Sequence, residues 1–265
     1  MTAYSHSKLS TFEQCPQKYK FRYIDKIKVL KKSIEAFLGS IVHETLEWIH
    51  NEVKSERIPN IDEAVIFYSK SWEQKYNQDI YIVKKELTIK DYFNTGIRFI
   101  LGYYTRNCPF NENTLETEKR IEVNLDDLKK NKIVGIIDRL VYNKEKEEYE
   151  IHDYKTGNTL PAQEKIESDR QLALYSIAIK NEFGKDKKTK LIWHYLAFDT
   201  KIYSERTNEQ LEQLKKETLE LIKKIENEKE FPTKKSPLCN WCEYKPICPA
   251  WKDVNNKKSL NKDFS

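Results

Sequence analysis

Two carboxylates and one amine have the types and the spacing needed for metal-assisted hydrolysis. Asp153 and Lys155 are two residues apart in an apolar run that begins at Tyr149, so their side chains point to one face of a strand. Asp138 lies within a second apolar run, where an uncompensated charge would be costly. Such oxygens bind Mg²⁺, and a nearby lysine can orient water during phosphodiester hydrolysis. The alternative is an ordinary Lys–Asp ion pair on an exposed strand.

Three further polar residues lie in segments with helical spacing. His43 flanks an apolar stripe and is a candidate metal ligand that would favour Mn²⁺ over Mg²⁺, although a lone helical histidine is more often structural. Gln171 and Tyr175 are one helical turn apart and are candidates for contacts to phosphate oxygens. Their alternative is an ordinary helix surface with Tyr175 packed on the sheet.

The cysteines predict a metal or cluster site. Cys239, Cys242 and Cys248 follow the spacing C-x2-C-x5-C, and soft thiolates select zinc or iron–sulfur clusters. The fourth ligand is Cys15 or Cys108, and Cys15 is preferred because the proline after it places its thiol at a joint between two short helices. A four-thiolate zinc site is the rival, although such sites usually use two C-x2-C pairs. Either would tie the two ends of the chain together.

The helices expected to position these residues follow from apolar residues at helical spacing. The segment from Ser7 to Ile24 predicts two short helices, with Ser10 and Glu13 at capping-box spacing. Residues 57–115 carry no chemical motif and are expected to form a helical insertion beside the sheet. The longer helices are expected over residues 33–53, 61–76, 87–106, 168–183 and 208–228.

Strand signals dominate the middle of the chain, and polar residues 143–147 predict the turn of an antiparallel meander. With the helices, the strands indicate an α/β fold in a single domain over residues 1–251. Residues 252–265 are rich in Lys, Asn and Ser, and they are expected to be a disordered tail. The strands are expected over residues 118–125, 132–142, 148–154, 191–198 and 201–206.

Composition sets limits on partners and compartment. The chain has 34% charged residues and a net charge of +5, which is compatible with a polyanionic partner. It contains no apolar run long enough to span a bilayer, and its N-terminus lacks a signal-peptide profile, so a cytoplasmic protein without membrane contact is expected. It also lacks the P-loop motif GxxxxGK[ST], so an ATPase motor would have to come from a partner.

Six short motifs, in order along the chain, resemble the PD-(D/E)XK nuclease superfamily. The resemblance is specifically to its iron–sulfur branch, which includes the RecB- and AddB-type nuclease domains and the CRISPR-associated exonucleases of the fourth Cas family. It implies a restriction-endonuclease-like mixed central sheet flanked by helices. The motifs are SKLSTFEQCPQKY, GSIVHETLE, GIIDR, IHDYKTG, QLALY and CNWC-x5-CP.

Carried over by position, the resemblance implies roles for the residues that it covers. His43, Asp138, Asp153 and the carbonyl of Tyr154 look like ligands of a Mg²⁺ or Mn²⁺ ion, and Lys155 looks like the catalytic lysine. The second acidic position departs from many relatives, which have Glu where this chain has Asp.

The resemblance also implies substrate contacts and a cluster. Gln171 and Tyr175 match the motif that follows the catalytic strand, and they are expected to support contacts to substrate. A [4Fe-4S] cluster is expected to join the N-terminal helices to the Cys-rich segment 237–251. Its implied ligands are Cys15, Cys239, Cys242 and Cys248.

The function expected from these features is that of a metal-dependent DNA nuclease. It is expected to be an exonuclease that prefers single strands or DNA ends, and to act either alone or as a subunit with a helicase or a CRISPR-adaptation partner. The first alternative is a catalytically inactive DNA-binding or scaffold subunit of such a complex, against which the intact Asp138, Asp153 and Lys155 argue. The second alternative is a zinc-stabilised scaffold or RNA-binding protein.

Basic and aromatic residues near the two chain ends suggest a groove for a nucleic-acid strand. Phosphate contacts and base stacking would hold the strand there. The alternative is that these residues are solvated surface and the edge of the core. They are Lys18, Lys20, Arg22, Tyr23, Trp241, Tyr244 and Lys245.

Overall fold

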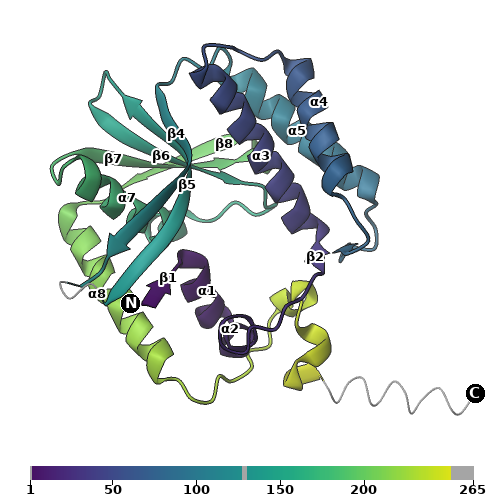
Figure 1. Cartoon of the computed structure of the whole chain (residues 1–265), viewed down its shortest axis with the longest axis vertical. Helices are drawn as coiled ribbons and strands as arrows, with labels where there is room; N and C mark the ends of the chain where they lie inside the picture. Colours follow the sequence, from purple (N-terminus) through teal and green to yellow (C-terminus); the bar gives the residue numbers. More distant parts are fainter. Residues whose placement is uncertain (1, 127–129, 252–265) are drawn as a thin grey trace, which may run out of the picture.

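A mixed six-stranded sheet lies between two groups of helices (Figure 1). The computed structural model describes residues 2–126 and 130–251. Strands run in the order β1, β5, β6, β7, β8, with β4 pairing to β5, and a small second sheet joins β2 to β3. The strands are β1 (Thr2–Tyr4), β2 (Lys32–Ser33), β3 (Ile80–Tyr81), β4 (Thr114–Asn124), β5 (Asn131–Asn143), β6 (Glu148–Lys155), β7 (Lys188–Tyr195) and β8 (Thr200–Glu205).

The helices fall into two groups, with α3, α4 and α5 on one side of the sheet and α7 and α8 on the other (Figure 1). Short 3₁₀ turns at Leu196–Phe198, Pro237–Trp241, Lys245–Ile247 and Pro249–Trp251 complete the described chain. The helices are α1 (His6–Gln14), α2 (Pro16–Tyr19), a π-helical turn (Lys20–Ile24), α3 (Ile34–Lys54), α4 (Ile61–Lys75), α5 (Ile89–Asn107), α6 (Gln163–Glu167), α7 (Arg170–Phe183) and α8 (Asn208–Asn227).

The mixed sheet flanked by helices confirms the predicted fold class. Strands β4, β5 and β6 form the expected antiparallel meander, and β7 pairs antiparallel with β8. Strands β6 and β7 are parallel, with α7 in the connection between them. Strands β1, β2 and β3 were not predicted, because two or three residues carry too little periodic signal.

The two short N-terminal helices meet at Cys15, as expected. The predicted capping box was wrong, however. Helix α1 begins at His6, and its N-cap is Ser5, whose Oγ accepts a hydrogen bond from the backbone N–H of Lys8. Ser10 and Glu13 therefore lie inside the helix, where their three-residue spacing has no capping role.

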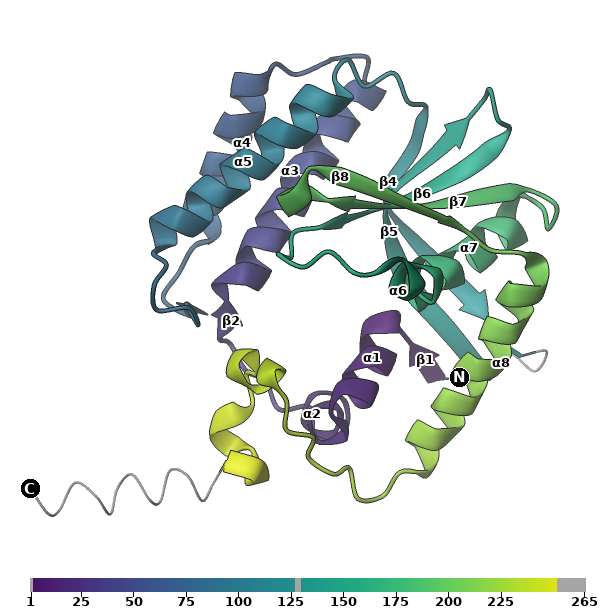
Figure 2. The same cartoon turned by 180° about the vertical axis from the view of Figure 1, so that it is seen from behind.

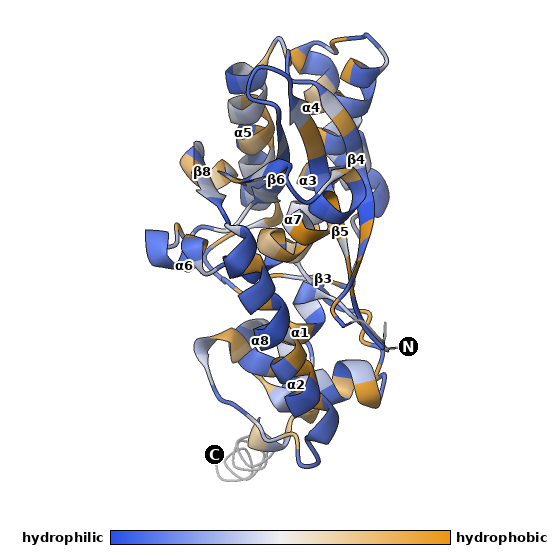
Figure 3. Cartoon of the chain, turned by 90° about the vertical axis from the view of Figure 1, so that its left-hand side faces the viewer, coloured by the Kyte–Doolittle hydropathy of each residue, from blue (hydrophilic) through white to orange (hydrophobic). Residues whose placement is uncertain are grey.

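Two hydrophobic cores hold the layers together. One joins the sheet to α1, α7 and α8, and the other joins α3, α4 and α5 to Tyr154 and Leu196. The helices of segment 57–115 thus pack against α3 and share its core. Seen from the side, α8 presents mainly hydrophilic residues outward (Figure 3). Among the described helices, none is both long enough and apolar enough to cross a bilayer.

The N-terminal helices and the Cys-rich segment lie side by side in both views (Figures 1 and 2). Lys18 forms an ion pair with Glu243 at 2.9 Å, and the Tyr244 hydroxyl donates to the Ile27 carbonyl at 3.0 Å. Segments more than 200 residues apart in sequence are therefore joined. The tail expected at 252–265 lies outside the described residues.

Candidate active site

Strands β5 and β6 bring Asp138 and Asp153 together where their ladder ends. The last registered pair is Arg139 with His152. Beyond it, the side chain of Asp138 replaces a backbone acceptor: its Oδ2 accepts the backbone N–H of Tyr154 at 2.8 Å. This bond holds the first carboxylate against the strand that carries the second.

His43 reaches this point from helix α3. Its Nε2 lies 2.8 Å from the Tyr154 carbonyl oxygen, and its Nδ1 lies 3.4 Å from Asp138 Oδ2. Burial opposes the charged form of the imidazole, but the carboxylates of Asp138 and Asp153 raise its pKa to about 9. Without a bound cation, His43 is therefore protonated, and its positive charge balances part of the negative charge of Asp138 and Asp153.

Asp153 is only 4% exposed and is held from two sides. Its Oδ1 accepts from Gln171 Nε2 at 2.9 Å, and its Oδ2 lies 2.6 Å from Lys155 Nζ. The two groups form a buried ion pair, in which the ammonium offsets part of the charge at Oδ2. Burial, partly offset by the charge of Lys155, raises the pKa of Asp153 to about 6.

Gln171 links the acid to the lysine. Its Oε1 accepts from Lys155 Nζ at 3.1 Å while its amide donates to Asp153. Burial opposes the charge of Lys155, but the adjacent Asp153 raises its pKa. The lysine is therefore a cation, and Gln171 and Asp153 fix the position of its amine.

Glu118 also faces this site and was missed in the sequence. One ligand atom each from His43, Glu118 and Asp138 lies within 4.8 Å of the other two. Thr117 and Lys119 pair with β5 on either side of Glu118, which puts it opposite Asp138 with a left-handed φ of 47°. It lies in a run of charged residues, and no motif distinguishes it from its neighbours.

Tyr175 lies one turn after Gln171 and is buried on the sheet. A Cβ added at Gly135 would lie 2.4 Å from Cε1 of the Tyr175 ring, so only glycine allows this close approach. Burial raises the pKa of Tyr175, which keeps it a neutral phenol. Gln171, Tyr175, Gly135 and Arg120 help to line a cavity of about 790 Å³ next to the acidic residues.

The variant Gly135→Ala is expected to lower the free energy of unfolding by about 1–3 kcal/mol, because the new methyl group overlaps the Tyr175 ring. Gly157→Ala is the matched control. It gains the same unfolded-state benefit but meets no atom within 4 Å, so a change within about 0.5 kcal/mol is expected. Urea denaturation compares the two, and equal stabilities would contradict the close packing.

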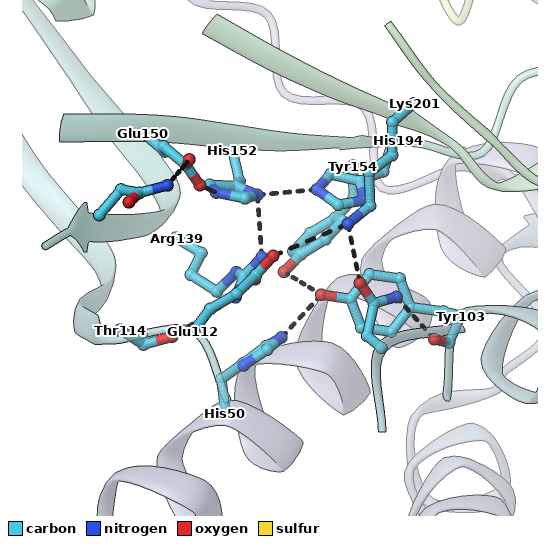
Figure 4. A network of polar contacts seen from close by, with 12 residues as sticks. His50, Tyr103, Glu112, Thr114, Arg139, Glu150, His152, Tyr154, His194 and Lys201 are labelled. Carbon is cyan, nitrogen blue, oxygen red and sulfur yellow. Dashed lines mark hydrogen bonds and ion pairs between the residues drawn. The ribbon is translucent and has the colours of Figure 1, made fainter. Parts of the chain in front are cut away.

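A buried polar network lies behind the site and fixes the backbone of Tyr154 (Figure 4). The Tyr154 hydroxyl is 3.1 Å from that of Tyr103, which is 2.7 Å from His50 Nε2. The peptide groups that contact His43 and Asp138 therefore belong to a residue anchored on the opposite side of the strand. Sequence reasoning missed this network.

The charge at the centre of the network belongs to Arg139, which is 1% exposed and forms an ion pair with Glu112 at 2.6 Å. Its guanidinium donates to His152 Nδ1 at 2.8 Å, so that nitrogen must accept, and His194 Nε2 donates to it at 2.8 Å. Burial lowers the pKa of both histidines well below the usual value. Both therefore stay neutral beside the buried cation (Figure 4).

The thiols form a separate pocket of about 50 Å³, lined by all four candidate cysteines. Cys108 lies elsewhere, exposed after the last residue of α5, which leaves Cys15 as the fourth thiol in the pocket. Among the described residues, no three sulfur atoms lie within 4.8 Å of one another, whereas a zinc tetrahedron with bonds of about 2.3 Å would bring them to about 3.8 Å. The four cysteines are Cys15, Cys239, Cys242 and Cys248.

Comparison with solved structures shows the fold. A chain described as a "Putative exonuclease" from Eubacterium rectale has a TM-score of 0.51 at 14% sequence identity, with 94% of this chain and 86% of that chain covered. The crystal structure of SSO0001 has a TM-score of 0.40 at 14% identity with the same coverage. A search of curated proteins found no match.

The family comparison covers nearly the whole described chain. The family model of the PD-(D/E)XK nuclease superfamily matches residues 3–249, from strand β1 to the last cysteine of the thiol pocket. All the candidate site residues fall within this match. The chain therefore belongs to the PD-(D/E)XK nuclease superfamily.

Proposed function

We propose that the chain is a divalent-metal-dependent nuclease that hydrolyses phosphodiester bonds in DNA, with a preference for single strands or ends. One observation carries the proposal: the buried carboxylate of Asp153, paired with the amine of Lys155, lies at the strand edge where Asp138 and His43 converge. Several carboxylates buried at one point are costly, and a bound cation would compensate their charge.

The donor set fits a hard divalent ion. Asp138, Asp153 and the Tyr154 carbonyl supply oxygens, and His43 supplies an imidazole nitrogen once it loses its proton. Glu118 adds a third carboxylate from strand β4. When bound, the ion would polarise a phosphoryl oxygen and lower the pKa of a coordinated water.

The residues around the ion do the positioning. Lys155, fixed by Asp153 and Gln171, can donate hydrogen bonds to the attacking water or to a phosphate oxygen. As a cation it also offsets the negative charge that grows on the phosphate. Gln171 and Tyr175 form the wall of the adjoining cavity, where they can contact the substrate strand.

The activity test is digestion of end-labelled DNA, single- and double-stranded, linear and circular, with Mg²⁺ or Mn²⁺ and with a chelator control. Cleavage that requires metal and is faster on linear single strands supports the proposal. Binding without cleavage under every metal condition would favour the alternative of an inactive DNA-binding subunit.

We also propose that the chain belongs to the iron–sulfur branch of the superfamily, with a [4Fe-4S] cluster in the thiol pocket. The support is that four thiols from both ends of the chain line one pocket. Thiolate ligands select such clusters or zinc. The cluster is proposed to be structural, because it would link α1 and α2 to the C-terminal segment.

Anaerobically purified protein is expected to be coloured and to contain iron, and Cys15→Ser is expected to lose most of both. The matched control is Cys108→Ser, whose thiol lies outside the pocket and whose loss should leave the iron content unchanged. Metal analysis and visible absorption measure the effect. A colourless wild-type protein that carries zinc and no iron would contradict the cluster.

A further inference from the structure

A groove outside the catalytic residues carries a local excess of positive charge. Its volume is about 700 Å³, and it lies along the connection from the π-helical turn to β2. Only one carboxylate, that of Glu243, is among its lining residues. Its six cationic residues are Lys18, Arg22, Lys26, Lys28, Lys31 and Lys32. We call this feature the basic groove.

Most of this charge is not neutralised within the chain. Glu243 is shared by Lys18, at 2.9 Å, and Arg22. Lys26, Lys28 and Lys31 are exposed and form no ion pair with any residue in the described part of the chain. Three ammonium groups on one short segment are therefore free to contact an anion, and a row of phosphates fits such an array.

Aromatic side chains form one wall of the groove, and hydrogen bonds hold them in place. Trp241 Nε1 lies 3.4 Å from Glu35 Oε1, and the Tyr81 hydroxyl donates to the Trp241 carbonyl at 3.2 Å. Tyr244, also in this wall, is held through its hydroxyl by Ile27. Within the described residues, the Trp241 indole stacks on no other aromatic ring. A base can therefore stack on it without displacing a partner ring.

Trp241 connects the basic groove to the catalytic lysine. The same side chain lines a second cavity, of about 1150 Å³, that is also lined by Thr156 and Gly157. These two residues directly follow Lys155 in the chain. In the view from behind, the C-terminal segment that carries Trp241 lies beside β2, at the end of α3 nearest the groove (Figure 2). The two cavities thus lead from exposed lysines to the end of strand β6.

We propose that the basic groove binds the backbone of a single nucleic-acid strand, and that Trp241 stacks on a base where the strand passes into the second cavity. The inference rests on the proposed function, since the path ends at the proposed active site. A single strand is specified because stacking needs an unpaired base. Four of the basic and aromatic residues that the sequence suggested for such a groove line it: Lys18, Arg22, Trp241 and Tyr244. Lys20 instead pairs with Asp25.

Binding of a labelled single-stranded oligonucleotide, measured by fluorescence anisotropy in chelator at several salt concentrations, tests the groove. Changing Lys26, Lys28 and Lys31 together to Gln is expected to weaken binding and to lower the slope of log affinity against log salt by about 2, because each lost contact removes about 0.7. The control changes Lys216, Lys223 and Lys224, exposed on α8, to Gln with the same loss of charge. The control is expected to keep the wild-type slope.

Stacking on Trp241 can be tested separately from the phosphate contacts. Trp241→Leu is expected to weaken binding about tenfold without changing the salt slope, and Trp241→Phe to restore most of the affinity. Melting temperatures identify any variant that fails to fold. If the phenylalanine variant folds but binds as weakly as the leucine variant, stacking by Trp241 is wrong. Duplex of the same sequence binding as tightly as the single strand would overturn the single-strand assignment.

Hydrolysis of a small diester tests the active site independently of the groove. Bis(4-nitrophenyl) phosphate is too short to reach from one to the other, so the triple lysine variant is expected to hydrolyse it at the wild-type rate. If the triple lysine variant matches the α8 control in affinity and slope, the groove is wrong and the proposed function stands. If no protein hydrolyses DNA or the diester while the groove variants lose binding, the groove stands and the proposed function fails.

Discussion

Replacing Lys155 by alanine, or Asp153 by asparagine, is expected to slow metal-dependent DNA cleavage by at least about 100-fold. The alanine change removes the amine that is paired with the buried acid, and the asparagine change removes the carboxylate charge that would hold a cation. Asparagine is nearly isosteric and can still accept the hydrogen bond from Gln171. The loss should therefore appear in turnover, with the fold retained.

The chain contains its own control for this experiment. Asp186 and Lys188 repeat the Asp-x-Lys spacing at the start of β7, where both are exposed. Asp186→Asn and Lys188→Ala should cleave at the wild-type rate. End-labelled single-stranded DNA with Mn²⁺ and then Mg²⁺ provides the measurement. Full activity in both Asp153→Asn and Lys155→Ala would exclude the proposed mechanism.

Metal affinity is expected to rise about tenfold per pH unit between about pH 6 and pH 9. Above pH 6 the carboxyl of Asp153 is ionised, whereas His43 keeps its proton until about pH 9. Binding of a cation through His43 must then displace one proton, so lower proton activity favours the metal. The same raised pKa stabilises the cation-free fold below about pH 6.5, and this contribution is lost as the pH rises through 9.

Calorimetric titration with Mn²⁺ in buffers of different ionisation enthalpy counts the released protons. One proton per ion is expected for the wild-type protein at pH 7.5, and close to none for His43→Gln, which should bind more weakly and with a flatter pH dependence. His6→Gln serves as the control, because that histidine lies on α1 beside Ser10. Equal proton release in wild type and His43→Gln would show that His43 is not a ligand.

Periodicity was enough to predict the long elements, since α3, α5 and α8 each bury one face and expose the other. The meander could also be predicted, because the β5 and β6 segments are joined by a short polar turn. Such signals are local. They arise from residues a few positions apart, and they missed short elements such as β1 and α6. Leu196–Phe198, expected at the end of a strand, forms a 3₁₀ turn instead.

The site was harder to predict, because its contacts join distant parts of the chain. Nothing near Glu118 indicates that it lies opposite Asp138, and nothing near Arg139 indicates that its side chain is buried against His152 of β6. Tyr175 was given two interpretations. The structure shows it packed on Gly135 and lining a cavity with Gln171, and its contact to phosphate stays a prediction. Periodicity in the sequence could not show that one side chain has both environments.

Cys15 lines a pocket with thiols near the other end of the described chain, so this pocket can form only late in translation. Cys15 and Cys239 are separated by 239 − 15 = 224 positions. At about 5–20 residues per second, a ribosome needs roughly 10–45 s between making the first of these thiols and the second. During that interval Cys15 lacks the other three thiols of the pocket. A metal ion or cluster bound there can therefore be fully ligated only after nearly all the described residues have been translated.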